Sequence, residues 1–434
     1  MSLTLFLVIL LLFLLLLNSM PVGFSLLVSG SAGLLVIAGL QTTLGVLKSS
    51  PYEQAASFSL STIPMFILMA EFLTAGRVTR ELFAACHMWL GRLRGGLSFA
   101  SVSAGVLLAA ISGSSSASAG TLASAAYPEM KRYGYDQAFA TGVVATVGTL
   151  ALMIPPSIGL VLFGIFTETS VSQLLLAGIV PGLMTAAGYA VTIFAITRIR
   201  PTAAPAGEQV YSLRQKAGSL IPIWPVIALM VVMIGSIYTG VITPTEAGAV
   251  GSLVALLLAV IKRRMTRGDF ITALTNATRN SAMIFTIIIG AMVFSVFLTL
   301  TGSTQDLIAA IHTSGMSRWW IFLAFILMYL ILGFFLDQLA ILILTLPLVF
   351  PIMMSLEYHP VWLGIVFVKT AEIGLVSPPL GLNVFIVGSV TNVPVSTVFR
   401  GIMPFLIADF IVLALIILFP EVVLYIPQVA AAVK

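Results

Sequence analysis

Long apolar stretches recur along the 434-residue chain, separated by short polar segments. Two examples are 219–236 and 401–420, each close to the roughly 20 residues that cross a bilayer as a helix. The first apolar stretch, 3–17, has no preceding basic residue and no clear small-residue cleavage site, and it runs through Pro21 into another at 22–47. We therefore expect a retained first span rather than a signal peptide.

Polar positions break two of the apolar segments near their middle. Residues 95–130 are interrupted by the serine-rich run at 112–116, and residues 318–356 are interrupted between Gly333 and Asp337. Each segment fits two half-length helices joined in a re-entrant hairpin, although two short full spans would also fit the first. The more polar segments that precede them, at 77–93 and 303–316, are expected to be amphipathic interfacial helices.

Proline pairs interrupt two further spans. Pro155-Pro156 lies within 138–168, and Pro378-Pro379 lies within 361–390. Proline lacks the amide donor and clashes inside a helix, so each pair predicts a broken transmembrane helix. The freed backbone groups are tolerated at membrane depth where they line a cavity, and unwound carbonyls suit a cation. Uninterrupted spans are expected at 170–197, 218–238, 244–261, 280–300 and 401–420, with a loop at 199–217.

Composition supports a membrane protein, because 59% of residues are hydrophobic and 8% are charged, against about 25% charged in soluble domains. The positive-inside rule, applied to the Lys and Arg clusters, predicts about ten crossings, two hairpins that enter from opposite sides, and both termini outside. The net charge of +5 thus reports topology rather than a nucleic-acid partner. A single cysteine excludes an internal disulfide framework and a cysteine metal cluster.

The two halves of the chain are related by a repeat. Shifting the sequence by 223 residues aligns 114–183 with 337–406 without a gap, and all four prolines of the first segment fall on prolines of the second. Combined with hairpins on opposite sides, this predicts an inverted-topology repeat, which is typical of secondary transporters. The predicted fold class is an all-α polytopic membrane protein with two re-entrant helical hairpins and two broken transmembrane helices.

Each half contains a candidate site made of hard oxygen ligands, which suit Na⁺. In the first half, the tip at 112–116 would face the break from Gly148-Thr149 to Pro155-Pro156-Ser157. The alternative is that small residues at 112–125 only allow close helix packing.

In the second half, the break runs from Glu372 to Ser377, followed by Asn383, and Asp337 lies at the opposing tip. A carboxylate at membrane depth suggests function. However, Lys369 and Glu372 could simply form an i,i+3 pair. Glu71 and Asp409 are expected to be helix-packing or subunit-contact groups.

Other classes of protein fit less well. An intramembrane serine hydrolase needs a base beside the nucleophile, and no histidine lies in a convincing core span. A channel would have little need of two broken-helix sites, and no nucleotide-binding motif for an ATP-driven pump is present.

Five ordered motifs resemble the large membrane (M) subunit of TRAP (tripartite ATP-independent periplasmic) transporters, and the resemblance covers nearly the whole chain. They are SGSSSASAGTLASAAYPEMKRYGYD at 112–136, LMIPPSIGLVLFG at 152–164, TPTEAGAVG at 243–251, LGFFLDQLAILILTLPLVFPI at 332–352 and AEIGLVSPPLGLNVF at 371–385.

The resemblance implies a multi-pass protein of the bacterial inner membrane that imports a small organic anion with Na⁺ by an elevator mechanism. It implies two or more coupling ions, no ATP, a small four-helix membrane (Q) subunit and a periplasmic substrate-binding (P) protein. A stand-alone Na⁺/dicarboxylate-type symporter is the alternative. The implied division is 1–76 scaffold, 77–169 first transport-domain repeat, 170–279 scaffold, 280–398 second transport-domain repeat, and 399–434 C-terminal helix and tail.

The resemblance also implies where ions and substrate bind. One Na⁺ site falls at Ser112, Ser114 or Ser115 with Gly148, Thr149 and Pro155, and the other falls at Gly333 and Thr345 with Glu372 and Ser377. Substrate would lie between them, near Ser114, Ser157, Asp337 and Asn383.

Overall fold

The computed structural model describes residues 3–207 and 211–433, and these residues form helices joined by short connections. The α-helices are α1 (Leu3–Leu17), α2 (Val22–Ala55), α3 (Thr62–Ala75), α4 (Val78–Leu90), α5 (Gly96–Ser112), α6 (Ser115–Arg132), α7 (Gln137–Val147), α8 (Ile158–Phe166), α9 (Val171–Ile199), α10 (Leu213–Leu220), α11 (Trp224–Thr239), α12 (Pro244–Ile261), α13 (Arg267–Leu300), α14 (Ser303–Thr313), α15 (Arg318–Phe335), α16 (Gln338–Ser355), α17 (Pro360–Gly374), α18 (Leu382–Thr391), α19 (Val395–Leu418) and α20 (Pro420–Val433). Short 3₁₀ helices are η1 (Ser59–Ser61), η2 (Gly148–Leu152) and η3 (Pro201–Ala203).

Within the described residues, seven helices are long and apolar enough to cross a membrane, or up to nine if each of two bent pairs is one span. Local capping explains where some of them begin. Helix α13 starts at Arg267 rather than near residue 280, because Thr266 and Asp269 form a capping box that satisfies its first amides. Similarly, Ser212 and Gln215 cap α10, which makes a helix of 213–220, partly within the predicted loop at 199–217.

Both predicted hairpins are helix–turn–helix units. Helices α5 and α6 are joined at Gly113, which has a left-handed φ of 58° that glycine adopts without steric cost. Helices α15 and α16 are joined at Leu336-Asp337. Ser114 and Asp337, which the 223-residue shift superposes, are the N-cap residues of the second helix in each hairpin. The two tips are therefore built alike.

The two predicted broken helices are also present. Helix α7 continues into η2 and stops before Pro155-Pro156, and α8 resumes at Ile158. Helix α17 ends at Gly374, and α18 begins at Leu382 after Pro378-Pro379. Both Pro-Pro peptide bonds are cis. The amphipathic segments appear as α4 and α14, each leading into a hairpin.

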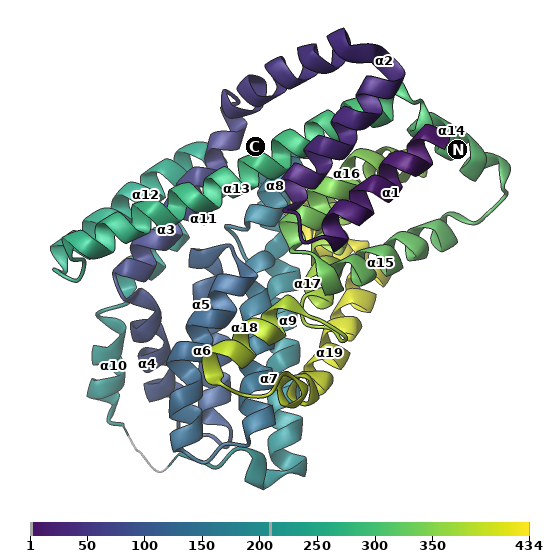
Figure 1. Ribbon diagram of the computed structural model, residues 1–434. Coiled ribbons are helices and arrows are strands. Elements are labelled where there is room, and N and C mark those ends of the chain that lie inside the picture. The colour runs from purple at the N-terminus through teal and green to yellow at the C-terminus, as the bar shows by residue number, and fades with distance from the viewer. Residues whose placement is uncertain (1–2, 208–210, 434) are drawn as a thin grey trace.

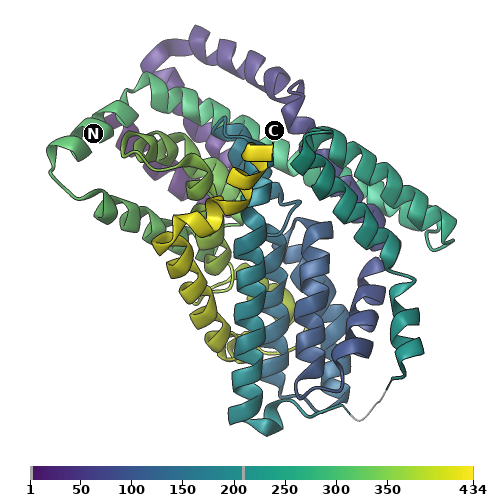
Figure 2. The same ribbon diagram turned by 180° about the vertical axis from the view of Figure 1, so that it is seen from behind.

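The second half of each broken helix packs against the hairpin of the other repeat. Helix α18 packs on α6 of the first hairpin, and α8 packs on α16 of the second. In the same way, α7 lies against α19 and α17 lies against α9; in the view from behind, α9 and α19 stand side by side (Figure 2). Contact between α7 and α19 is so close that a Cβ on Gly142 would overlap the Gly401 backbone. Each half thus completes the packing of the other.

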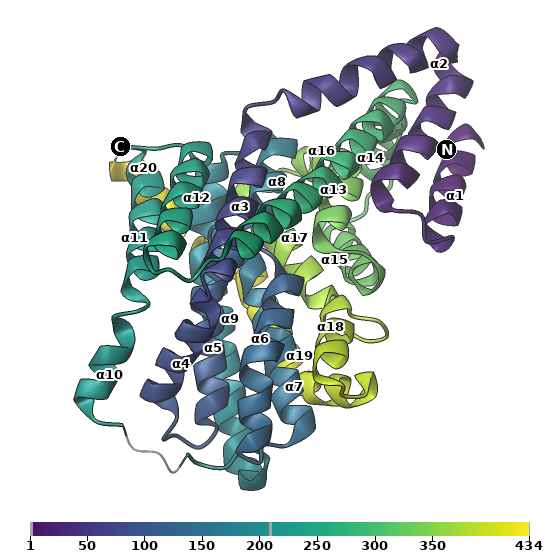
Figure 3. The same cartoon turned by 60° about the vertical axis from the view of Figure 1, so that its left-hand side comes forward.

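The remaining long helices pack mainly on one another. Helix α13 runs along α2 and α3, and α3 packs on α12. Figure 1 shows α13 crossing above the body that contains α5, α6, α7 and α9, and Figure 3 shows α2 and α13 extending away from it. The structure therefore has a hairpin body, made of the two hairpins (α5–α6 and α15–α16) and the two broken helices (α7–α8 and α17–α18), and an outer group of helices, α2, α3, α12 and α13. Helices α9 and α19 pack against the hairpin body.

Candidate functional site

The two hairpin tips line one cavity of about 1000 Å³. The first tip contributes residues 112–117, and the second contributes residues 335–340. The opposite wall comes from the start of α2, the middle of α3 and residues 279–287 of α13. Leu152 and Ile158 beside the first break, and Leu382 and Ile386 of α18, complete the lining. The cavity consequently lies between the hairpin body and the outer helices.

Serine oxygens dominate the first tip. The Ser112 hydroxyl donates to the Ser114 carbonyl oxygen over 3.2 Å, and the Ser114 and Ser116 hydroxyl oxygens lie 3.3 Å apart. Ser114 also caps α6 by accepting from the Ala117 amide. The tip abuts the first break, because a Cβ on Gly113 would lie 3.0 Å from the Pro156 carbonyl oxygen. The predicted meeting of this tip with the Pro-Pro break is confirmed.

At the second tip, Asp337 is the N-cap of α16, as its position before Gln338 predicted. Its carboxylate accepts from the Leu339 amide over 3.1 Å and lines the cavity. The neighbouring Gln338 is 1% exposed, and neither of its amide atoms has a hydrogen-bond partner among the described residues. An unpartnered buried amide costs free energy, so a cavity-facing ligand or water would stabilise it.

Two of the four predicted substrate-contacting residues lie behind the cavity lining rather than in it. The Asn383 amide donates to the Ser115 hydroxyl oxygen over 2.6 Å, which ties α18 to the first hairpin. Ser157 is fully buried, caps α8, and donates to the Leu152 carbonyl oxygen over 2.5 Å. Ser114 and Asp337 are the two that reach the cavity. Asn383 and Ser157 therefore lie behind the cavity lining, and their contact with substrate stays a prediction.

The remaining Na⁺ candidates lie at different depths. Thr345 is two turns into α16, and its hydroxyl donates to the Tyr329 hydroxyl oxygen over 2.6 Å. The Ser377 hydroxyl donates to the Ile373 carbonyl oxygen. Gly333 packs on the end of α17, where its added Cβ would lie 2.7 Å from the Gly374 Cα. The hydroxyls of Thr345 and Ser377 both act as donors in these hydrogen bonds, which leaves their oxygen lone pairs available to a cation.

In the first half, Gly148 packs against α6, where an added Cβ would lie 2.7 Å from the Ala119 Cα. Pro155 lines a small apolar space away from the cavity. Thr149 turns toward α9: its hydroxyl donates to the Thr146 carbonyl oxygen over 2.7 Å and lies 3.2 Å from the Tyr189 hydroxyl oxygen. Gly148, Thr149 and Pro155 thus pack against neighbouring elements and do not line the cavity.

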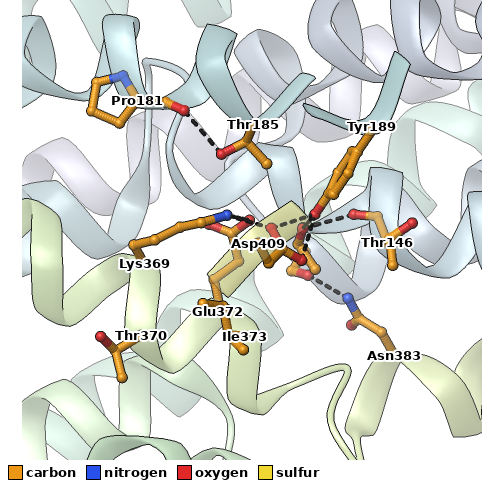
Figure 4. Close-up of polar contacts among 12 residues, drawn as sticks. Thr146, Pro181, Thr185, Tyr189, Lys369, Thr370, Glu372, Ile373, Asn383 and Asp409 are labelled. Atoms are coloured by element: carbon orange, nitrogen blue, oxygen red, sulfur yellow. Dashed lines mark hydrogen bonds and ion pairs between the residues drawn. The ribbon is translucent and has the colours of Figure 1, made fainter. Parts of the chain in front are cut away.

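A buried charge network lies behind the tips, and Figure 4 shows it converging from both halves. The Lys369 ammonium is 2.7 Å from Asp409 Oδ1 and 3.0 Å from Glu372 Oε1, and Tyr189 donates to Asp409 over 2.9 Å. All three charged side chains are at most 1% exposed. The i,i+3 pairing of Lys369 with Glu372 is confirmed, and Asp409 is a helix-packing group.

Sequence reasoning missed three features of the site. Gln338 shares its position under the 223-residue shift with Ser115, and each contacts the partner repeat: Gln338 packs on Gly159, and Ser115 binds Asn383. Arg279 lines the cavity from α13. Glu71, expected to be a packing group, also lines the cavity while accepting a hydrogen bond from Asn276. The repeat alignment offered a signal for Gln338 alone.

A cavity bounded by two symmetry-related helical hairpins, in a chain with this many spans, defines a multi-pass membrane transport protein. The family model "Tripartite ATP-independent periplasmic transporter, DctM component" matches residues 9–422. The chain belongs to this family, and it is a multi-pass protein of the inner membrane.

Individual relatives agree with this assignment. The chain is 36% identical to the C4-dicarboxylate TRAP transporter large permease protein DctM of Pseudomonas aeruginosa, over 91% of this chain and 92% of that protein. It is 31% identical to the sialic acid TRAP transporter large permease protein SiaM of Vibrio cholerae, over 95% and 96% of the two chains. The crystal structure of the Alcanivorax borkumensis YdaH transporter has the same fold, with a TM-score of 0.63, 13% identity, and coverage of 90% and 91%.

Proposed function

We propose that this chain imports a small organic anion with Na⁺, as the large membrane subunit of a binding-protein-dependent TRAP transporter. The observation that carries the proposal is the single cavity lined by both hairpin tips. One tip is rich in hydroxyl oxygens and the other carries a carboxylate, Asp337, and these are ligands that suit Na⁺. Dicarboxylate, sialic acid and ectoine appear in the names of relatives, which supports a small organic solute.

The proposed Na⁺ sites lie where each tip meets a break. In the first, Ser112, Ser114 and Ser115 combine with carbonyl oxygens near Pro156. In the second, carbonyl oxygens of 333–337 combine with those of 374–378. The hydroxyls of Thr149, Thr345 and Ser377 donate to other protein oxygens, and in the proposal their lone pairs remain available to these sites.

We further propose an elevator motion in which the hairpin body slides against the outer helices. The cavity lies at the boundary between these groups, where sliding would carry the tips past α2, α3 and α13. Helices α9 and α19 are placed in the moving body, because Tyr189 and Asp409 join them to Lys369 of α17 through buried contacts. If α17 slid against α19, the buried Lys369–Asp409 ion pair would break, which costs about 3–5 kcal/mol.

Coupling is tested by reconstituting the chain with its small membrane subunit and periplasmic binding protein. Uptake of labelled succinate, sialic acid and isethionate is measured with a Na⁺ gradient and with K⁺ in its place. We expect uptake that needs both Na⁺ and the binding protein. Undiminished uptake in K⁺ would refute Na⁺ coupling, and uptake without the binding protein would favour a stand-alone symporter.

The elevator motion is tested with cysteine pairs that join a hairpin tip to α13, in a Cys86→Ser background. We expect crosslinking that changes with Na⁺ and substrate, because the tips leave α13 when the body moves. A control pair between α9 and α19 should crosslink equally in every condition. Equal crosslinking of the tip pairs under all conditions would argue for a fixed body.

A further inference from the structure

Arg279 is a cation in the cavity wall that faces the hairpin tips. It lies 12 residues after Arg267, the first residue of α13, which places it about 18 Å along the helix axis. It is the one Lys or Arg among the described residues that line the cavity, and the neighbouring Asn280 lines it too. Within the described part of the chain, no ion pair involves Arg279.

Arg279 comes immediately before the apolar part of α13, the expected span at 280–300, and its side chain is exposed and lines the cavity. Two carboxylates share the cavity with Arg279, and each accepts a hydrogen bond from an amide. Asp337 accepts from the Leu339 amide, and Glu71 accepts from Asn276 over 3.2 Å. Among the described residues, neither carboxylate forms an ion pair with Arg279, so its guanidinium group is open to a ligand in the cavity.

We propose that Arg279 binds the carboxylate or sulfonate of the transported anion. The guanidinium group offers a planar pair of donors that matches either group, and such charge-assisted bonds are strong. This inference rests on the proposed function, and it names Arg279 as the residue that recognises the charged group of the transported anion. It places that residue on α13, outside the hairpin body, whereas the serine tip and Asp337 belong to the body.

Arg279 and the hairpin tips belong to parts of the protein that move relative to each other in the proposed elevator motion. The anion contacts Arg279 while the tips face α13, and it loses that contact when the hairpin body moves away. Arg279 thus favours capture in the arrangement seen here and leaves the affinity of the displaced arrangement unchanged. A ligand with differential affinity for two arrangements shifts their equilibrium, so the anion would favour the arrangement in which the tips face α13.

The first experiment needs no knowledge of the substrate. In a Cys86→Ser background, Asn280→Cys places a thiol beside Arg279, and its rates of modification by an anionic sulfonatoethyl and a cationic trimethylammonioethyl methanethiosulfonate are compared. Adding Arg279→Gln should lower the anionic-to-cationic rate ratio several-fold, because removing the cation makes the local electrostatic potential more negative. Arg267→Gln removes the same charge from the same helix outside the cavity and should leave the ratio unchanged. A ratio that Arg279→Gln does not alter would overturn the proposal.

The second experiment measures uptake of labelled succinate, sialic acid and isethionate by the full complex. Arg279→Gln should raise the KM for the transported anion about 10- to 100-fold and leave half-saturating Na⁺ unchanged, while Arg279→Lys should recover part of the loss. A lower maximal rate at unchanged KM would indicate a structural role and contradict the proposal. If the wild-type complex takes up none of these anions with Na⁺, the proposed function fails, and the labelling ratio still decides whether Arg279 attracts anions.

Discussion

The buried network of Lys369, Glu372 and Asp409 offers a sharp test of how the hairpin body is held together. Replacing Lys369 by Met removes the single cation and keeps the length of the side chain. Two carboxylates then lie close together, each at most 1% exposed and without a counter-charge. The protein must either bury this charge or protonate both groups.

Breaking a buried ion pair by removing one partner costs about 3–5 kcal/mol. We expect Lys369→Met to lower the free energy of unfolding by at least this amount, since it strands two carboxylates. Asp409→Asn leaves the Lys369–Glu372 pair neutral overall, and Glu372→Gln leaves the Lys369–Asp409 pair, which keeps the 2.7 Å contact and the Tyr189 hydrogen bond. Glu372→Gln should therefore cost least, and Lys369→Met most.

The assay is unfolding of the purified protein in mixed micelles by increasing amounts of a denaturing detergent, followed by tryptophan fluorescence. The matched control is the triple variant Lys369→Met, Glu372→Gln, Asp409→Asn, which removes all three charges at once. Removing all three charges leaves no unpaired buried ion, so the triple variant should recover part of the loss. Equal destabilisation by all three single variants, or no recovery in the triple variant, would refute the charge argument.

Three further predictions concern the tips. Asp337→Asn should keep the α16 cap and normal folding, because Asn caps about as well as Asp, yet lose uptake or shift its Na⁺ dependence; wild-type kinetics would remove Asp337 from the site. Gly333→Ala should lower the yield of folded protein, because its Cβ would lie 2.7 Å from the Gly374 Cα, whereas Gly218→Ala, with nothing within 4 Å, should not; size-exclusion profiles compare the two. Asn383→Leu should cost about 1–3 kcal/mol in the same unfolding assay and slow uptake, because Ser115 loses its 2.6 Å partner; unchanged stability would contradict that role.

Much of the architecture was readable in the sequence, because it depends on local rules. Apolar length marks the spans, Pro-Pro pairs stop α7 and α17, and Ser114 and Asp337 begin helices through their own side chains. The 223-residue shift relates those two caps, since prolines repeat where backbone interruptions repeat. Each of these features concerns residues within a few positions of one another.

Tertiary structure decided which predicted residues meet. Thr149 and Glu372 are counterparts in the repeat, yet Thr149 lies beside Tyr189 of α9, whereas Glu372 pairs with Lys369 of its own helix. Asp409 reaches Lys369 across 40 positions. The contacts of Thr149 with Tyr189 and of Lys369 with Asp409 depend on the rotation and approach of helices that are distant along the chain. Sequence periodicity determines which face of a helix is apolar, but only packing determines which side chain of another helix lies opposite it.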